Sequence, residues 1–211
     1  MSVHMEPPLP DGSLRKGGEM AQTSSTEAEL AAIKSVANMM AATARTAPKG
    51  RGVDGIKTMV VDGDDLETIA MAMEEAAPGR PDVVEAAFRR DANSVRQSAC
   101  VVLIGVDGAP KKPEKPFDCG ACGFRTCAAL ANARRMRAGE DDFSGPVCAI
   151  ASMDLGVALG SAVKLAADHG IDNRMMYTMG VAVAKMGWLD ADVVIGIPLS
   201  ASAKNIYFDR G

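Results

Sequence analysis

The sequence predicts an α/β domain into which a separate cysteine-rich module is inserted. Segments with helical apolar periodicity alternate with short runs that are apolar at almost every position, and this alternation predicts the α/β class. The apolar runs, typical of buried strands, lie at 100–105 and 193–197, and a further strand is predicted at 56–61. Four cysteines between residues 119 and 148 interrupt the alternation. We therefore predict a single α/β sandwich over residues 25–211, with the inserted module at about 116–150.

Composition limits the function classes. With 47% hydrophobic residues, the 211-residue chain can bury the core of one compact domain. Its formal net charge of -4 argues against a general surface for nucleic acid or anionic membrane. Because four of the five cysteines fall in a metal-binding pattern, we expect reduced thiols and a cytoplasmic location. The longest apolar run, Leu155–Val163, is too short to span a bilayer, so no membrane span is expected.

The N-terminal residues 1–24 are predicted to be a disordered extension. They are rich in proline and glycine and show no apolar periodicity. The segment Lys16-Gly17-Gly18-Glu19 can be encoded by a purine-rich stretch that resembles a ribosome-binding site. We therefore expect Met20 to be the natural start.

Helices are predicted from capping and apolar spacing. The first begins near Ser25, where Thr26 and Glu29 have capping-box spacing, and ends before Pro48. Later helices are predicted over Asp64 to Ala77, Asp82 to Ser98, Ala128 to Ala138, Ala149 to His169, and about Met176 to Met186. In the last of these, methionine and valine recur at helical spacing, which is typical of core packing.

The residues 118–127 read DCGACGFRTC and contain three cysteines, Cys119, Cys122 and Cys127. The fourth, Cys148, follows after a helix-length gap. A tight loop of this kind can hold three corners of a polyhedral cofactor while the returning chain supplies the last. The grouping of three plus one favours a 4Fe-4S cluster. Structural zinc, which usually takes two separated pairs, and scattered buried thiols are the alternatives.

The residues around the cysteines support a thiolate-rich site. Gly120 and Gly123 each follow a cysteine, where a missing side chain lets backbone amides approach sulfur. His4 and His169 lie far from the motif, so histidine ligation has no local support. Cys100 opens an apolar run outside this spacing and is predicted to be a core residue.

Two basic segments have open interpretations. The loop Ala47–Gly52 is basic and broken by glycine, so it can offer cations and amides to a phosphate or be an ordinary solvated connection.

A second basic group follows the cysteine loop and consists of Arg134, Arg135 and Arg137, with Arg125 upstream. These residues can balance an anionic cluster, steer an acidic electron-transfer partner or form a solvated helical face. The segment 110–116, rich in lysine and proline, is predicted to be an extended tether into the module.

The cysteine run and the later Gly-Pro-Val-Cys resemble the four-cysteine iron-sulfur domain of the B subunit of the Rnf electron-transport complex and of corrinoid iron-sulfur proteins. A longer stretch, from about Glu29 to Arg210, resembles the uncharacterised ferredoxin-domain-containing proteins of bacteria and archaea. The motifs that carry this resemblance are Arg51-Gly52-Val53-Asp54, Phe88-Arg89-Arg90-Asp91-Ala92, Met153-Asp154-Leu155-Gly156, Gly170-Ile171-Asp172-Asn173-Arg174 and Gly196-Ile197-Pro198-Leu199-Ser200. This family implies a cluster but no assigned reaction.

The order of elements is also similar to the nitroreductase fold. The similarity rests on the long first helix, the A-P-K-G-R loop and strand, the D-L-G-V-A-L-G-S-A-V helix, the G-I-D-N turn, the M-G-x-A-x-A-K-M-G helix and the G-I-P-L-S segment. Nitroreductases bind FMN across a homodimer interface, so the similarity implies FMN, with Arg45, Lys49 and Arg51 as the matching contacts, and a homodimer. The inserted cysteine module departs from that family.

The sequence thus predicts a protein that binds a 4Fe-4S cluster through Cys119, Cys122, Cys127 and Cys148 and acts in electron transfer with a redox partner protein. Two alternatives remain open: an FMN-dependent reductase fed by the cluster, and a redox-responsive or metal-responsive binding module. No proton-transfer constellation is evident in the sequence, and whether the protein is an enzyme stays open.

Overall fold

The computed structural model describes residues 22–136 and 142–208. Most of the predicted disordered extension, including Met20 and His4, lies outside the described residues, as do Arg137 and Arg210. Residues 22–24 precede the first helix without regular structure.

Within the described residues, the core is a four-stranded antiparallel sheet in the order β1-β2-β4-β3. Its strands are β1 (Ile56–Asp62), β2 (Cys100–Val106), β3 (Asp172–Asn173) and β4 (Val193–Ser200). Strand β2 is central and buried along its whole length. Its first residue, Cys100, pairs with Asp62 on one side and Leu199 on the other.

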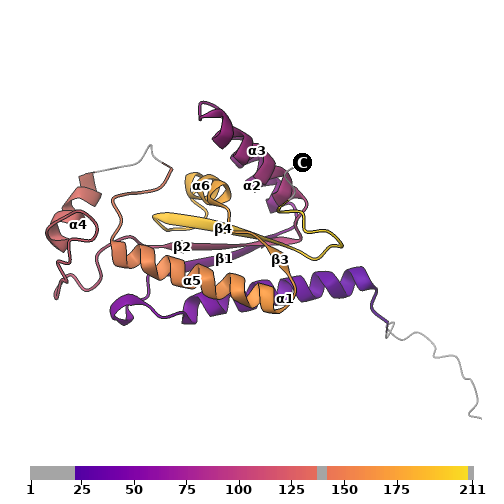
Figure 1. Ribbon diagram of the computed structural model, residues 1–211, viewed down its shortest axis with the longest axis horizontal. Helices are drawn as coiled ribbons and strands as arrows, with labels where there is room; N and C mark the ends of the chain where they lie inside the picture. The colour runs from indigo at the N-terminus through magenta and orange to yellow at the C-terminus, as the bar shows by residue number, and fades with distance from the viewer. Residues whose placement is uncertain (1–21, 137–141, 209–211) are drawn as a thin grey trace, which may run out of the picture.

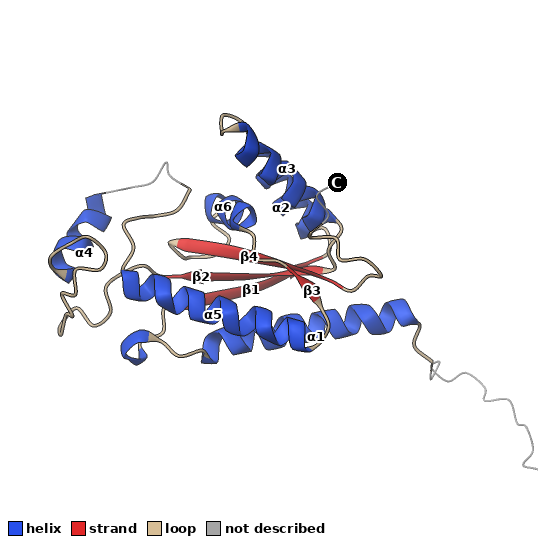
Figure 2. Cartoon of the chain, viewed as in Figure 1, coloured by secondary structure: helices blue, strands red, loops and turns tan. Residues whose placement is uncertain are grey.

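Helices cover both faces of the sheet and form three layers, which confirms the predicted α/β sandwich (Figure 1, Figure 2). Two long helices, α1 (Ser25–Thr46) and α5 (Ala149–Asp168), lie on one face. The other face is covered by three helices: α2 (Asp65–Glu75), α3 (Asp82–Arg96) and α6 (Tyr177–Met186).

The side chains of β2 alternate between two apolar cores, as the period of a strand requires. Val102 and Ile104 belong to the core under α1 and α5. Val101 and Leu103 belong to the core under α2, α3 and α6. A strand with no solvent-facing side must be apolar at every position, which explains the run that identified it in the sequence.

Helix α6 packs very closely on β4. A Cβ atom added to Gly180 would lie 1.8 Å from the carbonyl oxygen of Val194, so only glycine fits at this crossing. Met176 and Met179 are buried beside it, which confirms that the methionine spacing marks a core helix.

The first helix begins at Ser25, as predicted, but the predicted capping of two helices, by Thr26 with Glu29 and by Asp64 with Glu67, needs correction. The capping box of α1 is formed by Ser24 and Glu27, not by Thr26 and Glu29: the Ser24 hydroxyl accepts from the Glu27 amide at 3.3 Å, and the Ser24 amide donates to the Glu27 carboxylate at 3.0 Å. Asp64 precedes α2 as predicted, but its side chain makes no capping hydrogen bond. The backbone of Asp64 is helical, which turns its carboxylate away from the capping geometry.

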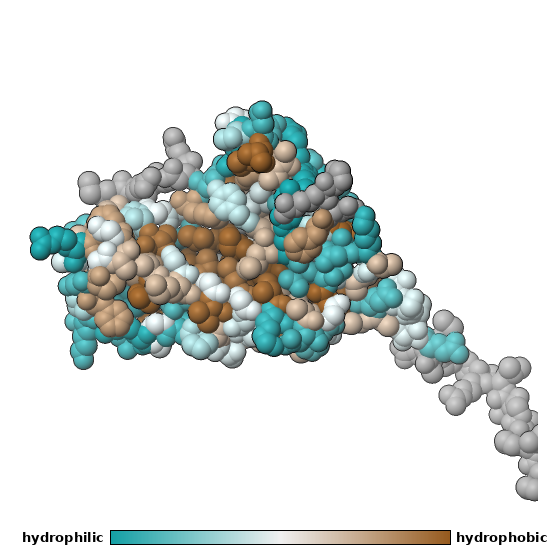
Figure 3. Space-filling view, in the orientation of Figure 1, coloured by the Kyte–Doolittle hydropathy of each residue, from teal (hydrophilic) through white to brown (hydrophobic). Residues whose placement is uncertain are grey.

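Helix α5 is long and apolar enough to cross a membrane by length and composition alone, which the shorter run 155–163 did not suggest. It packs along α1 and against the sheet, and core helices of soluble proteins pass the same test. Figure 3 shows apolar residues gathered across the middle of the face on which α5 lies.

Candidate metal centre

The cysteine module occupies the end of the sheet where β2 terminates. The chain leaves β2 at Val106, passes through the loop 107–126, forms α4 (Cys127–Met136) and returns as a segment we call the strap, residues 142–148. Figure 1 shows α4 set apart from the two helical layers at this end. This excursion, residues 107–148, overlaps the predicted insertion at about 116–150, which stays a prediction.

The structure places the four predicted ligands in different environments. Cys119 is exposed, and Cys122 is half-buried against the core under α1 and α5. Cys127 is half-buried as the first residue of α4. Cys148 is buried, 7% exposed, immediately before α5. All four are free thiols.

The loop that carries the first three cysteines needs residues that tolerate left-handed backbone. Gly120 and Gly123 have φ values of +72° and +85°, and a Cβ added to either would meet nothing within 4 Å, so backbone conformation rather than space requires glycine. Asp118, at φ 47°, folds back so that its carboxylate accepts from the Cys127 amide at 2.7 Å. The Gly123 amide donates to the Gly120 carbonyl at 2.9 Å, so this amide closes a turn and does not face sulfur.

The described residues contain no group of three or more histidine, cysteine or acidic side chains arranged to hold a metal ion. The structure therefore brings the four thiols into one module without bringing them into ligand geometry. The donor set itself suits an iron-sulfur cluster, because it consists of four unpaired thiols and includes no hard oxygen donor. Cluster ligation by these four residues stays a prediction.

Two of the four cysteines lie at helix N-termini. Cys127 begins α4, and Cys148 is the N-cap of the 20-residue α5, where its side chain makes no capping hydrogen bond. Unpaired amides and the helix dipole favour negative charge at such positions. The fold therefore suits anionic thiolates at both places.

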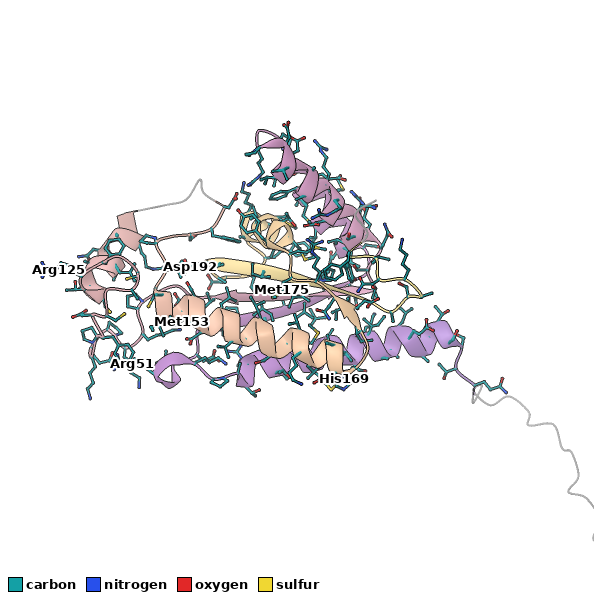
Figure 4. All side chains as sticks on the ribbon, in the orientation of Figure 1. Arg51, Arg125, Met153, His169, Met175 and Asp192 are labelled. Atoms are coloured by element: carbon teal, nitrogen blue, oxygen red, sulfur yellow. The ribbon has the colours of Figure 1, made fainter. Side chains whose placement is uncertain are left out.

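A hydrogen-bond hub holds the strap, α4 and the sheet together. The Arg134 guanidinium donates to the Pro146 carbonyl at 2.8 Å and to the Asp192 carboxylate at 2.6 Å. The same Asp192 oxygen accepts from the Gly108 amide at 2.7 Å, and the Gly108 carbonyl accepts from the Cys148 amide at 2.8 Å. Cys148 is thus fixed relative to the ends of β2 and α4. Figure 4 shows Asp192 on the side of the sheet nearest the module.

This hub corrects the interpretation of Arg134 as part of a solvated or steering basic face. Its side chain is only 17% exposed, and its guanidinium already pairs with Asp192 and donates to the Pro146 carbonyl. Arg125 is exposed and is compatible with a steering role. The side chain of Arg135, like Arg137, lies outside the described part of the chain.

The predicted tether 110–116 is anchored rather than free. Lys111 is buried, and its ammonium lies 3.7 Å from the Asp154 carboxylate on α5, with both side chains less than a tenth exposed. The second Asp154 oxygen accepts from the Gly50 amide at 2.7 Å. Nothing in a Pro-Lys-Lys-Pro segment signals which lysine is buried. Asp154 lies in one of the motifs that carry the family resemblance, but nothing in that motif indicates a partner in the segment 110–116.

The three residues predicted to contact FMN all have partners within the chain. Lys49 donates to main-chain carbonyls at the end of α1, including that of Ala44 at 3.1 Å. Arg45 pairs with Asp54. Arg51 donates to the Lys111 and Lys115 carbonyls. The loop 47–52 thus caps a helix and supports the module, and phosphate binding by it stays a prediction.

Asp142 ties the beginning of the strap to the other helical layer. Arg80, before α3, donates to it at 2.8 Å, and the Tyr177 hydroxyl on α6 donates to it as well. The Arg80 guanidinium is the main cause that lowers the pKa of Asp142 to about 2. The rings of Tyr177 and Phe143 meet edge to face with centroids 5.4 Å apart. These residues lie far apart in the sequence, and none of them belongs to a motif that predicts the contact.

Cys100 is fully buried in β2, as predicted for a core residue. Burial raises the pKa of its thiol to about 11. It therefore remains a neutral thiol, and it lies at the opposite end of β2 from the module.

Comparison with known proteins identifies the family. Residues 144–210 match the family described as "Uncharacterized protein containing a ferredoxin domain (DUF2148)", a stretch that includes Cys148 and begins after the other three cysteines. An uncharacterized protein from Archaeoglobus fulgidus is 49% identical over 178 residues, covering 84% of this chain and 91% of that protein.

Solved structures of the nitroreductase family are similar in the arrangement of the backbone. A nitroreductase family protein from Clostridium novyi is 17% identical, with a TM-score of 0.46 over 83% of this chain and 77% of that one. A nitroreductase with bound FMN from Desulfitobacterium hafniense is 13% identical, with a TM-score of 0.47 over 81% and 80%.

The Archaeoglobus fulgidus relative covers most of this chain, and the family model matches residues 144–210. The nitroreductase likenesses concern backbone arrangement alone and carry no functional residue across. The chain belongs to the family of uncharacterized proteins that contain a ferredoxin domain.

Proposed function

We propose that this protein is a cytoplasmic one-electron carrier that binds a 4Fe-4S cluster through Cys119, Cys122, Cys127 and Cys148. The observation that carries the proposal is the cysteine spacing, three in a glycine-broken loop and one at the start of α5, in a chain whose family contains a ferredoxin domain. We expect its partner to be a redox protein rather than nucleic acid, because the chain carries a net charge of -4.

The residues of the module have distinct tasks under this proposal. When bound, a 4Fe-4S cluster supplies one-electron exchange. Phe124 and Val147 pack against the apolar core and limit access of water near the thiols. The N-termini of α4 and α5 favour the negative charge of Cys127 and Cys148. The hub around Arg134 holds the strap in place.

The first test is the composition of protein prepared anaerobically with iron in excess. We expect equal amounts of iron and acid-labile sulfide, about four of each per chain. Stoichiometric zinc without sulfide would overturn the proposal in favour of a structural zinc site.

A pair of cysteine variants tests the ligand set. Cys148→Ser replaces a soft thiolate by a poor ligand and is expected to leave a three-iron cluster or none. Cys100→Ser is the matched control, since it places a hydroxyl in the core at a cost of about 1–3 kcal/mol yet leaves iron and sulfide unchanged. Full iron in the Cys148 variant together with loss in the Cys100 variant would show that the ligand set is wrong.

The two alternatives make different demands. An FMN-dependent reductase must bind flavin, but no observation in the described residues favours it, because Arg45, Lys49 and Arg51 all have intramolecular partners. Retention of added FMN, and its loss in Arg45→Ala with Lys49→Ala, would support that function. A metal-responsive binding module would use the same four cysteines and would bind the cluster without exchanging electrons with redox proteins.

A further inference from the structure

A groove lies directly beside Cys127, which is one of its lining residues. It has a volume of about 450 Å³ and runs between the segment after β2 and the first turns of α4. Most of its lining is apolar, including Pro110, Pro113, Pro116, Ala128 and Ala131, and Cys127 also lines it. The two polar lining residues already have partners, because the Asp118 carboxylate accepts from the Cys127 amide and the Thr126 hydroxyl accepts from the Ala129 amide. An occupant must therefore present a largely apolar surface to the groove.

One side of the groove, the proline wall, consists of Pro110, Pro113 and Pro116, and neighbouring residues fix it to the rest of the domain. Lys111, between two of the prolines, is buried against Asp154. Arg51 donates to the Lys111 carbonyl at 3.4 Å and stacks on the Phe117 ring, with its guanidinium carbon 4.4 Å from the ring centroid. Because both ends of this segment are fixed, it loses little conformational entropy when a partner binds, and this lowers the free-energy cost of binding.

The edges of the groove are basic although the chain as a whole is acidic. Lys112 and Lys115 are exposed on the proline side, and Arg125 is exposed just before α4. Figure 4 shows Arg125 at the outer tip of this end of the molecule. Among the exposed residues around the groove, the basic residues Lys112, Lys115 and Arg125 outnumber the acidic residues Glu114 and Asp118, in a chain of net charge -4. A locally positive edge of this kind attracts acidic surfaces.

We propose that this groove is the docking surface for an acidic electron-transfer protein, which inserts an apolar side chain beside Cys127. The proposal rests on the proposed function, because Cys127 connects the groove with the cluster. Apolar contact in the groove would set the distance between the two redox centres, and the basic edges would set orientation and the rate of encounter. In the reaction, one electron leaves the reduced partner and is accepted by the cluster-loaded protein.

The charge of the groove can be measured without a cluster. In the full-length, cluster-free chain, Cys127 is labelled with an anionic sulfonated methanethiosulfonate and with its cationic trimethylammonium counterpart, and rates are read by peptide mass spectrometry. Reversing Lys112, Lys115 and Arg125 to glutamate is expected to lower the ratio of anionic to cationic rates about tenfold at low ionic strength. The control reverses Lys34, Arg89 and Lys164, exposed residues outside the module, and has the same net charge. Equal ratios in the two variants would overturn the proposal.

Docking is tested with the cluster-loaded protein and a reduced acidic flavodoxin as the probe. The expected result is one-electron oxidation of the flavodoxin that slows with added salt, and slows at least tenfold in the groove triple variant but not in the control triple variant. Ala128→Trp fills the groove and should slow the reaction, whereas Ala129→Trp, on an exposed neighbour that does not line the groove, should not.

The outcomes separate this inference from the proposed function. Absence of iron and sulfide would end the proposed function, while the labelling ratio would still report the charge of the groove. A loaded protein that reacts equally fast with flavodoxin in all variants would overturn the docking surface alone. Dimers in sedimentation that Ala128→Trp abolishes, or binding to vesicles of phosphatidylglycerol, would assign the groove to a second copy or to a membrane and would also overturn it.

Discussion

Arg134 on α4 and Asp192 before β4 are joined by a 2.6 Å hydrogen bond that connects the cysteine module to the sheet. Asp192 also accepts from the Gly108 amide, and both side chains are about one-fifth exposed. Removing either partner leaves polar groups of the hub without their hydrogen bonds.

The first prediction concerns this pair. Asp192→Asn should lower the free energy of unfolding by about 1.5–3 kcal/mol, because hydrogen bonds to a charged group are replaced by neutral ones. It should also speed alkylation of Cys148 in the cluster-free chain, since the Gly108 carbonyl that holds the Cys148 amide is displaced. Urea unfolding and peptide-resolved alkylation measure the two effects. Asp190→Asn, at an exposed position nearby, is the control and should change neither. Equal alkylation in the two variants would contradict a positioning role.

The buried pair of Lys111 and Asp154 gives the second prediction. Lys111→Met leaves a buried carboxylate without its cation and should cost about 3–5 kcal/mol of unfolding free energy. Adding Asp154→Asn should recover most of this loss, because the amide oxygen can still accept from Gly50. Lys112→Met, at the exposed neighbour, should stay within about 0.5 kcal/mol of the unchanged protein. A double variant no more stable than Lys111→Met would show that charge is not the cause.

The third prediction is a pH dependence. The folded-state pKa of Asp142 is about 2, below its ordinary value, so the ionised form is stabilised by folding. This stabilisation is present above about pH 4 and is lost as the pH falls toward 2, and it amounts to about 2 kcal/mol. Unfolding measured across this window should show a steeper fall for the unchanged protein than for Asp142→Asn. Parallel curves would show that Arg80 does not hold this carboxylate in solution.

The fourth prediction concerns the reactivity of Cys100. Because burial raises the pKa of this thiol to about 11, it should resist iodoacetamide at pH 8 until the chain unfolds. Cys119, which is exposed, should react at once in the cluster-free chain and is the internal reference. Fast modification of Cys100 under native conditions would mean that the sheet opens at that end.

Strands and helices could be predicted because burial leaves a local signal. Strand β2 is apolar throughout since both of its faces are covered, and α6 shows its buried methionines at helical spacing. Strand β3 was missed because a two-residue strand exists only through its pairing with β4. The capping box was placed two residues late because Ser24 with Glu27 and Thr26 with Glu29 have the same spacing.

For the candidate site too, only features that are local in the sequence could be predicted. The spacing of the cysteines identified the module, but it contains no information on how the thiols lie relative to one another. The partners Lys111 and Asp154, or Arg134 and Asp192, lie far apart in the sequence. A charge in a polar segment gives no sign that its partner lies on another element, so these pairs could be found only in the folded chain.

The two ends of the cysteine module meet at the hydrogen bond between the Cys148 amide and the Gly108 carbonyl. An inserted segment whose two ends lie close together can be replaced by a short turn, because the flanking elements then keep their positions. In this protein four of the five thiols lie between the two residues of that junction, counting Cys148 itself, and Cys100 lies outside. Two charge pairs also tie the excursion to its host, so a chain that lost it would have to supply new partners for Asp154 and Asp192.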